Sequence, residues 1–183
     1  MNIITGKFKG RKLISLSTKN TRPTLNRIKE SVFNIINDYI DNSVVLDLFA
    51  GSGALGIECI SRGANMVYFN DSNPESENVI LKNLKGDLTN AKILCVDYLD
   101  AISIIKDKFS LVFIDPPYAS DMGEKAIWKL AKENKLKNGA ILIFEHNDKK
   151  DLQTLPKGCI IEKIKVFGNK IIHFIKYEVN NGC

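Results

Sequence analysis

The four residues Asp115-Pro116-Pro117-Tyr118 could hold a planar base that carries an exocyclic amino group. Two consecutive prolines lack backbone N–H groups and fix two φ angles, so this turn is rigid and no strand or helix needs its carbonyl oxygens. The carboxylate of Asp115 and the carbonyl oxygen of Pro116 can each accept one N–H, and Tyr118 can stack on the ring. A turn that merely ends a strand would contain similar residues, so the motif alone leaves both interpretations open.

The position of this motif favours a binding site. It follows the apolar run Leu111–Ile114, which is typical of a buried parallel strand. In open α/β sheets, ligands bind in the crevice beyond the carboxyl ends of the strands.

A second motif, Val45–Gly56, predicts a strand, an acidic residue, a glycine-rich turn and the start of a helix. Residues 51–56 match the GxGxxG pattern, and Asp71 lies 20 positions after Gly51, where an acid can hold ribose hydroxyls. These features are shared with nicotinamide-dependent dehydrogenases. Asp47 argues against that class, because a carboxylate four residues before the first glycine would repel a pyrophosphate and attract a cationic ligand.

Carboxylates follow each of the first four predicted strands of the alternating region. They are Asp47, Asp71, Asp97 and Asp115. S-adenosylmethionine carries a sulfonium, an ammonium, a ribose diol and an adenine amine, all of which suit this row better than NAD does. The sequence therefore predicts S-adenosylmethionine as the cofactor.

The positive charge is concentrated at the start of the chain. The net charge is +5, but residues 1–29 contain eight Lys or Arg and no Asp or Glu, so residues 30–183 have a net charge of −3. Exposed surfaces usually mix both signs. This asymmetry predicts a polyanion-binding segment.

Length indicates a single domain, and the cysteine content indicates a reducing compartment. A chain of 183 residues fits one core, and we find neither a secretory signal pattern nor an apolar stretch long enough to span a bilayer. The four cysteines form no CxxC pair and indicate free thiols in the cytoplasm. No His/Cys/Asp cluster has metal-ligand spacing, so no metal is expected. We assign no chemical role to His146 and expect His173 at the surface or at a sheet edge.

Apolar runs that alternate with amphipathic segments predict βαβ units around a parallel sheet. The expected strands are Val44–Leu48, Met66–Asn70, Lys92–Val96, Leu111–Ile114 and Ala140–Glu145, and the expected helices are Ser52–Ser61, Pro74–Leu84, Ala101–Lys106 and Glu124–Asn134. Cys159–Val166 and Lys170–Glu178 should form an antiparallel hairpin at one edge. Before this region, Met1–Ile14 suggests two short strands joined by a basic loop, and a helix should follow Thr24 and run to Tyr39 or Ile40.

These motifs resemble a known class of enzymes. DLFAGSGALGIE (residues 47–58) with DPPY is similar to class I, Rossmann-like methyltransferases that methylate amino groups. IITGKFKGRKL and TRPTLNRIKESVFNII resemble the bacterial 16S rRNA guanine-N2 methyltransferase D family, whose pattern is a Gly-Gly-basic hairpin and then RPT-x-D-R-hydrophobic-basic-E-hydrophobic-FN. The resemblance covers essentially the whole chain. Thr5 and Asn26 depart from the pattern, in which Gly and Asp are usual, and both lie in the RNA-docking part.

The resemblance implies a seven-stranded, mostly parallel sheet, with residues 1–40 forming an RNA-docking hairpin and helix and residues 41–183 forming the S-adenosylmethionine-dependent domain. It places Asp47, Gly51 and Gly53 at the methionine part of the cofactor, Asp71 at the ribose and Asp97 at the adenine amine, and it includes Phe49 among the cofactor-binding residues. Asp115, Pro116, Pro117 and Tyr118 would hold the target base. Lys7, Lys9, Arg11, Lys12, Arg22 and Arg27 would contact RNA.

The implied reaction is methylation of the N2 amine of a guanine in 16S rRNA, within the 30S subunit or an assembly intermediate, by a monomeric cytoplasmic enzyme. Four alternatives remain open at this point. A DNA adenine methyltransferase would share DPPY but usually carries an added target-recognition region. A protein-glutamine methyltransferase more often has Asn at the position of Asp115. A ribosome-assembly factor without catalysis and the NAD dehydrogenase are the other two.

Overall fold

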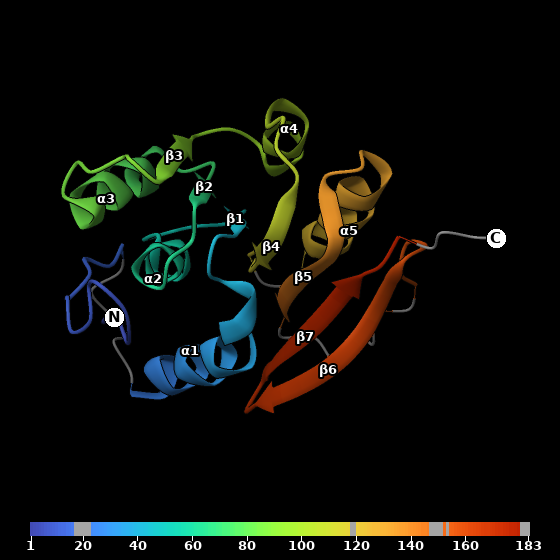
Figure 1. The fold of residues 1–183 in the computed structure, drawn as a ribbon, viewed down its shortest axis with the longest axis horizontal. Coiled ribbons are helices and arrows are strands. Elements are labelled where there is room, and N and C mark those ends of the chain that lie inside the picture. Colours follow the sequence, from blue (N-terminus) through green and yellow to red (C-terminus); the bar gives the residue numbers. More distant parts are fainter. Residues whose placement is uncertain (17–22, 118–119, 147–151, 153, 180–183) are drawn as a thin grey trace.

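A seven-stranded sheet with helices on both faces forms the centre of the molecule (Figure 1). The computed structural model describes residues 1–16, 23–117, 120–146, 152 and 154–179. The strands are β1 Val44–Asp47, β2 Met66–Asn70, β3 Ala91–Leu94, β4 Phe109–Ile114, β5 Leu136–His146, β6 Cys159–Phe167 and β7 Lys170–Tyr177. Their order is β3-β2-β1-β4-β5-β7-β6, in which β7 lies antiparallel to both β5 and β6.

The helices divide between the two faces of the sheet. They are α1 Pro23–Ile35, η1 Asn37–Tyr39, α2 Ala54–Ser61, α3 Pro74–Leu84, α4 Tyr98–Ile104 and α5 Met122–Lys132. Apolar residues of α1, α2 and α3 form one core with one face, and those of α4 and α5 form a second core with the other. Because side chains alternate along a strand, Val45 faces the first core and Leu46 the second.

The connections reverse direction at β1. The chain leaves β1 to form β2 on one side, and later returns to place β4 on the other side. A crevice opens at the carboxyl ends of strands where the order reverses in this way. The glycine-rich turn after β1 and the Asp115 motif after β4 therefore meet at the same edge.

The N-terminal hairpin is fastened to the end of α2. An isolated bridge joins Asn2 to Lys12, and Gly6 packs so tightly that a Cβ there would lie 1.7 Å from the carbonyl oxygen of Ser61. The Ser61 hydroxyl accepts from the backbone N–H of Phe8 at 2.9 Å and donates to the carbonyl of Thr5 at 2.6 Å. The basic loop is thus held in a fixed place on the core.

The expected fold class is confirmed, with several differences in detail. The two short N-terminal strands are reduced to a single bridge, and α1 ends at Ile35, with η1 completing the segment. β3 ends at Leu94 instead of the expected Val96, and Asp97, which was expected directly after the strand, caps α4. The expectation for His173 was wrong: its side chain is buried on β7, where it packs against the rings of Phe144 and His146.

Candidate functional site

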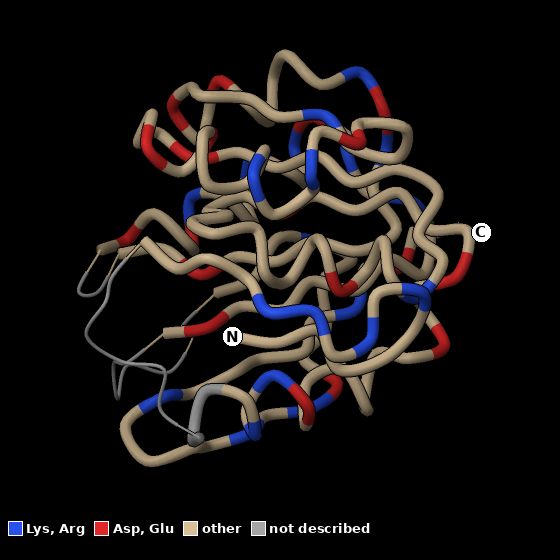
Figure 2. The backbone as a smooth tube through the Cα atoms, turned by 90° about the vertical axis from the view of Figure 1, so that its left-hand side faces the viewer, with Lys and Arg blue, Asp and Glu red and all other residues tan. Residues whose placement is uncertain are grey.

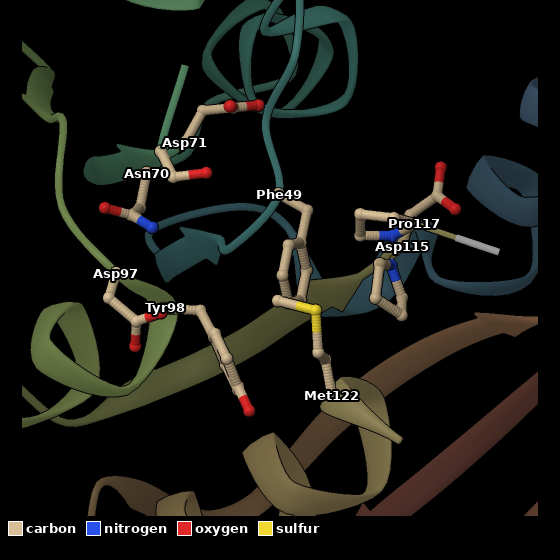
Figure 3. Close-up of a pocket in the computed structure, with 10 residues that line it drawn as sticks. Phe49, Asn70, Asp71, Asp97, Tyr98, Asp115, Pro117 and Met122 are labelled. Atoms are coloured by element: carbon tan, nitrogen blue, oxygen red, sulfur yellow. The ribbon is translucent and has the colours of Figure 1, made fainter. Parts of the chain in front are cut away.

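A first cavity, of about 330 Å³, opens at the carboxyl ends of β1, β2 and β4 (Figure 3). We call it the acidic cavity. It brings together three of the four predicted carboxylates with aromatic and apolar side chains. Its lining residues are Phe49, Asn70, Asp71, Ser72, Asp97, Tyr98, Asp115, Pro116, Pro117 and Met122.

Backbone hydrogen bonds fix two of these carboxylates. Asp71 accepts from the backbone N–H of Gly51 at 2.8 Å with one oxygen and from that of Asn73 at 2.9 Å with the other. Asp97 accepts from the N–H of Leu99 at 2.8 Å, as the cap of α4. A carboxylate offers about four lone-pair sites, so both residues can accept further bonds from a ligand.

A second cavity, of about 250 Å³, adjoins the first, because Phe49 and Asp115 line both. We call it the inner cavity. It lies between the glycine-rich turn, α1 and the ends of β1, β4, β5 and β7. Its other lining residues are Met1, Ile28, Lys29, Val32, Asp47, Ala50, Gly51, Ser52, Ala54, Leu55, Phe113, Ile114, Ile143, Glu145, Lys170 and Ile172.

Asp47 is buried at the wall of the inner cavity, with 2% of its surface exposed. Its carboxylate accepts from the backbone N–H of Gly56 at 3.0 Å, in the first turn of α2. Burial raises the pKa of Asp47 to about 7, and repulsion from Asp71 adds to this, while the Gly56 bond opposes it. Such a carboxylate gains from a cationic ligand, which would stabilise its ionised form.

The glycine-rich turn depends on the absence of side chains at three positions. Gly51 and Gly53 have φ values of 52° and 74°, which disfavour other residues. Gly56 packs against β2, where a Cβ would lie 2.3 Å from the ring of Phe69. The turn is therefore open to close approach by a ligand, and its helix lies close against the sheet.

Asp115 lies at the meeting point of the two cavities, and Figure 3 shows it on the side of Phe49 away from Asp71 and Asp97. Its side chain reaches solvent, yet the cavity walls displace much of the water around it. This burial raises the pKa of Asp115 to about 7, the negative Glu145 raises it further, and Lys170 opposes both. Pro116 is buried beside it, and Tyr118 lies outside the described residues.

The hairpin carries several basic residues at or near the surface of the molecule. Lys7, Lys9 and Lys12 are exposed, and the guanidinium of Arg11 lies 3.9 Å from the ring centroid of Phe8. Figure 2 views the molecule from the side on which the hairpin lies. Arg27 is exposed on α1, and Arg22 lies outside the described residues.

Sequence reasoning missed Glu58, which is fully buried on α2. It accepts from the backbone N–H groups of Ile4 and Thr5 at 2.8 and 3.0 Å, and it pairs with Lys29 and Arg62, both at 2.9 Å. These partners hold the pKa of Glu58 below its usual value although burial opposes them. An acid within an apolar helix was the available signal.

Sequence reasoning also missed Glu145 and Lys170, which form an ion pair in the inner cavity. Glu145 lies at the carboxyl end of β5, as the predicted acids lie at the carboxyl ends of their strands. Its position within an apolar run made it look like part of the strand, although the same strand-end rule applied to it.

The described part of the chain offers neither a metal site nor a membrane-spanning helix. No group of three or more His, Cys, Asp or Glu side chains there is placed to hold a metal ion. No described helix is both long and apolar enough to cross a membrane. His146 contacts His173, with 3.2 Å between Nε2 and Nδ1, and both rings stack near Phe144.

Comparisons with known proteins agree with this arrangement. The family model described as "Conserved hypothetical protein 95" matches residues 1–176. "Ribosomal RNA small subunit methyltransferase D" of Haemophilus influenzae is 37% identical, over 97% of this chain and 93% of that protein. A solved structure from Escherichia coli has a TM-score of 0.87 at 28% identity and covers 98% of this chain and 99% of its own. One from Haemophilus influenzae has a TM-score of 0.82 at 33% identity and covers 97% and 98%.

Proposed function

The chain belongs to the ribosomal RNA small subunit methyltransferase D family, and from that membership we propose that it transfers the methyl group of S-adenosylmethionine to the N2 amine of a guanine in 16S rRNA. The observation that carries this proposal is the position of Asp115, where the two cavities meet. One cavity has the groups that a nucleoside needs, and the other extends toward the basic hairpin.

The residues present fit S-adenosylmethionine. Asp71 and Asp97 offer acceptors to a ribose diol and an adenine amine, and Phe49, Tyr98 and Met122 supply an apolar wall for the adenine ring. On the other side of Phe49, Asp47 and the glycine-rich turn suit the methionine part, because the buried carboxylate attracts an ammonium group. When bound, the cofactor supplies an electrophilic methyl group on a sulfonium.

The turn at Asp115 would orient the nucleophile. The amine of guanine is weakly nucleophilic, because its lone pair is delocalised into the ring. Two hydrogen bonds, to the Asp115 carboxylate and the Pro116 carbonyl, favour a pyramidal nitrogen and aim its lone pair at the methyl. This nitrogen would take the methyl group of the bound cofactor, the electron pair of the broken C–S bond would stay on sulfur, and Asp115 or solvent would take the proton that the methylated nitrogen loses.

We assign the RNA contacts to residues 1–40 and the reaction to residues 41–183. The support is spatial: Met1, Ile28 and Val32 line the inner cavity, so the hairpin and α1 flank the place of the target base. Lys7, Lys9 and Lys12 are exposed on the same hairpin and can neutralise phosphates. Arg11, Arg22 and Arg27 belong to the same assignment, and Tyr118 would stack on the base.

The substrate that we propose is 16S rRNA within the small subunit or an assembly intermediate, and we propose that the enzyme acts as a cytoplasmic monomer. The relative from Haemophilus influenzae carries a small-subunit rRNA name, whereas a DNA adenine methyltransferase would share only the Asp115 motif. We favour an enzyme over a non-catalytic assembly factor because the glycine-rich turn and Asp115 are both present.

A methyl-transfer assay tests this proposal. Labelled S-adenosylmethionine is offered with 30S subunits, 16S rRNA, DNA and protein, and we expect label in rRNA or subunits only. Asp115→Ala should lower kcat by about 10²–10³-fold, because it removes the carboxylate that stabilises the positive charge developing on the attacking nitrogen. The wild-type rate should also fall as the pH drops through about 7, where Asp115 becomes protonated.

Two outcomes of this assay would count against the proposal. Label in DNA or protein, or in none of the acceptors although the cofactor binds, would overturn the assigned function. Full activity in Asp115→Ala would refute the mechanism alone. Asp121→Ala, which changes an exposed acid at the start of α5, is the matched control and should leave kcat within about twofold.

A further inference from the structure

Three charged side chains lie in a row on one face of the sheet at the wall of the inner cavity. Ile114 pairs with Phe144 across β4 and β5, so Asp115 and Glu145 follow on neighbouring strands, which lie about 4.8 Å apart. On β7, Lys170 pairs with Glu145 as an ion pair and has the same parity as Ile172, the partner of Glu145 in register. The order across the sheet is carboxylate, carboxylate, ammonium.

All three groups can reach the cavity. Asp115, Glu145 and Lys170 each line it. The side chains of Glu145 and Lys170 remain 15% and 18% exposed, so the pair is accessible from the cavity. The influence of Glu145 and Lys170 on the pKa of Asp115 shows that the three charges act on one another.

The row matches the hydrogen-bonding edge of one base. Guanine presents an amine donor at N2, an N–H donor at N1 and an acceptor at O6 along its Watson–Crick edge. A carboxylate accepts only, and an ammonium donates only. Asp115, Glu145 and Lys170 are therefore complementary to N2, N1 and O6, in that order.

Resting on the proposed function, we propose that Glu145 and Lys170 are specificity-determining residues that select guanine: Glu145 accepts the N1–H and Lys170 donates to O6. Adenine fits this row poorly, since its N1 is an acceptor and would face the Glu145 carboxylate. A site built for a hydrogen bond rejects an analogue that lacks it, because its own buried group is left without a partner. The same ion pair holds both groups in place before the base enters.

The base analogue 2-aminopurine tests this inference. It keeps the reacting amine but has an acceptor at N1 and no O6. After the methylated guanine has been mapped, that position is filled with guanine or 2-aminopurine in otherwise identical RNA. We expect wild type to prefer guanine by about 10²-fold in kcat/KM. In Glu145→Gln the preference should shrink to about tenfold or less, because the Gln amide can donate to the N1 of 2-aminopurine.

Lys170→Met provides a second variant. It should lower kcat/KM for guanine by about tenfold or more while it changes the value for 2-aminopurine by less than threefold, since that base has no O6. Glu162→Gln is the matched control, because Glu162 lies on β6, exposed and away from the cavity. Binding of S-adenosylmethionine, measured by calorimetry, should stay within about twofold of wild type in all three variants.

The outcomes separate this inference from the proposed function. Wild type that forms no N2-methylguanine would refute the proposed function. Wild type that methylates guanine and 2-aminopurine equally, or Glu145→Gln that loses activity equally on both bases, would overturn the specificity role. An equal loss on both bases is the result that a purely structural role predicts.

Discussion

At the scale of single residues, the site depends on carboxylates placed where their charge is unfavourable without a ligand. Burial raises the pKa of both Asp47 and Asp115 to about 7. The sequence predicted both positions, because each follows an apolar strand. It could not predict the raised pKa values, since these result from the packing of residues distant in sequence around each carboxylate.

Proton release on cofactor binding should therefore depend on Asp47. In the protein without cofactor, Asp47 is largely protonated at pH 6.5, below its pKa of about 7. The ammonium of S-adenosylmethionine favours the ionised form, so binding should release protons. Calorimetry at pH 6.5 in buffers of different ionisation enthalpy measures this release. Asp47→Asn should release fewer protons and bind more weakly, and equal release in both proteins would contradict the assignment.

At the scale of elements, α2 connects the glycine-rich turn to the N-terminal hairpin. Its first turn follows the glycine-rich turn, and Glu58, farther along the helix, holds Ile4, Thr5 and Lys29. Strands and helices could be predicted to within a few residues because apolar periodicity reports local burial. The contacts of Glu58 with the hairpin could not, because Ile4 and Thr5 lie 54 and 53 residues away and periodicity does not show which segments meet.

Glu58→Gln should destabilise the protein by about 3 kcal/mol, because it leaves Lys29 buried without its charged partner. Urea unfolding at pH 7 measures this loss. Its sign follows from the lowered pKa of Glu58: the stabilisation is present above the ordinary pKa and is lost as the pH falls through the folded value. The difference in unfolding free energy between variant and wild type should thus shrink in acid.

Glu77→Gln is the matched control, at an exposed position on α3, and should change the free energy of unfolding by less than about 0.5 kcal/mol. A loss equal to that of Glu58→Gln would argue against a special role for the buried network.

At the scale of the whole molecule, the inner cavity joins two features of opposite charge: the basic N-terminal hairpin, whose Met1 lines it, and the acidic cavity, which adjoins it. The charge asymmetry in the sequence predicted the first, and the row of acids predicted the second. Their adjacency comes from the docking of the hairpin on Ser61 and of α1 on the sheet. The basic hairpin and the acidic cavity therefore carry charge of opposite sign, although both pack on one core.

Charge reversal of the hairpin should weaken RNA binding without weakening cofactor binding. Replacing Lys7, Lys9 and Arg11 by Glu should weaken RNA binding by at least about tenfold at moderate salt and reduce the salt dependence of binding. Affinity for S-adenosylmethionine should stay within about twofold. Reversal of Lys129, Lys132 and Lys137, on and near α5, provides a control of equal charge. An equal loss of RNA binding in both triple variants would indicate a nonspecific charge effect.

The identity of the methylated nucleoside tests the central claim most directly. Small subunits or 16S rRNA that lack the modification are incubated with the enzyme and S-adenosylmethionine, digested to nucleosides and examined by mass spectrometry against synthetic standards. We predict N2-methylguanosine as the new product, absent when Asp115→Ala is used for the same time. N6-methyladenosine, or a guanosine methylated at another atom, would contradict the account.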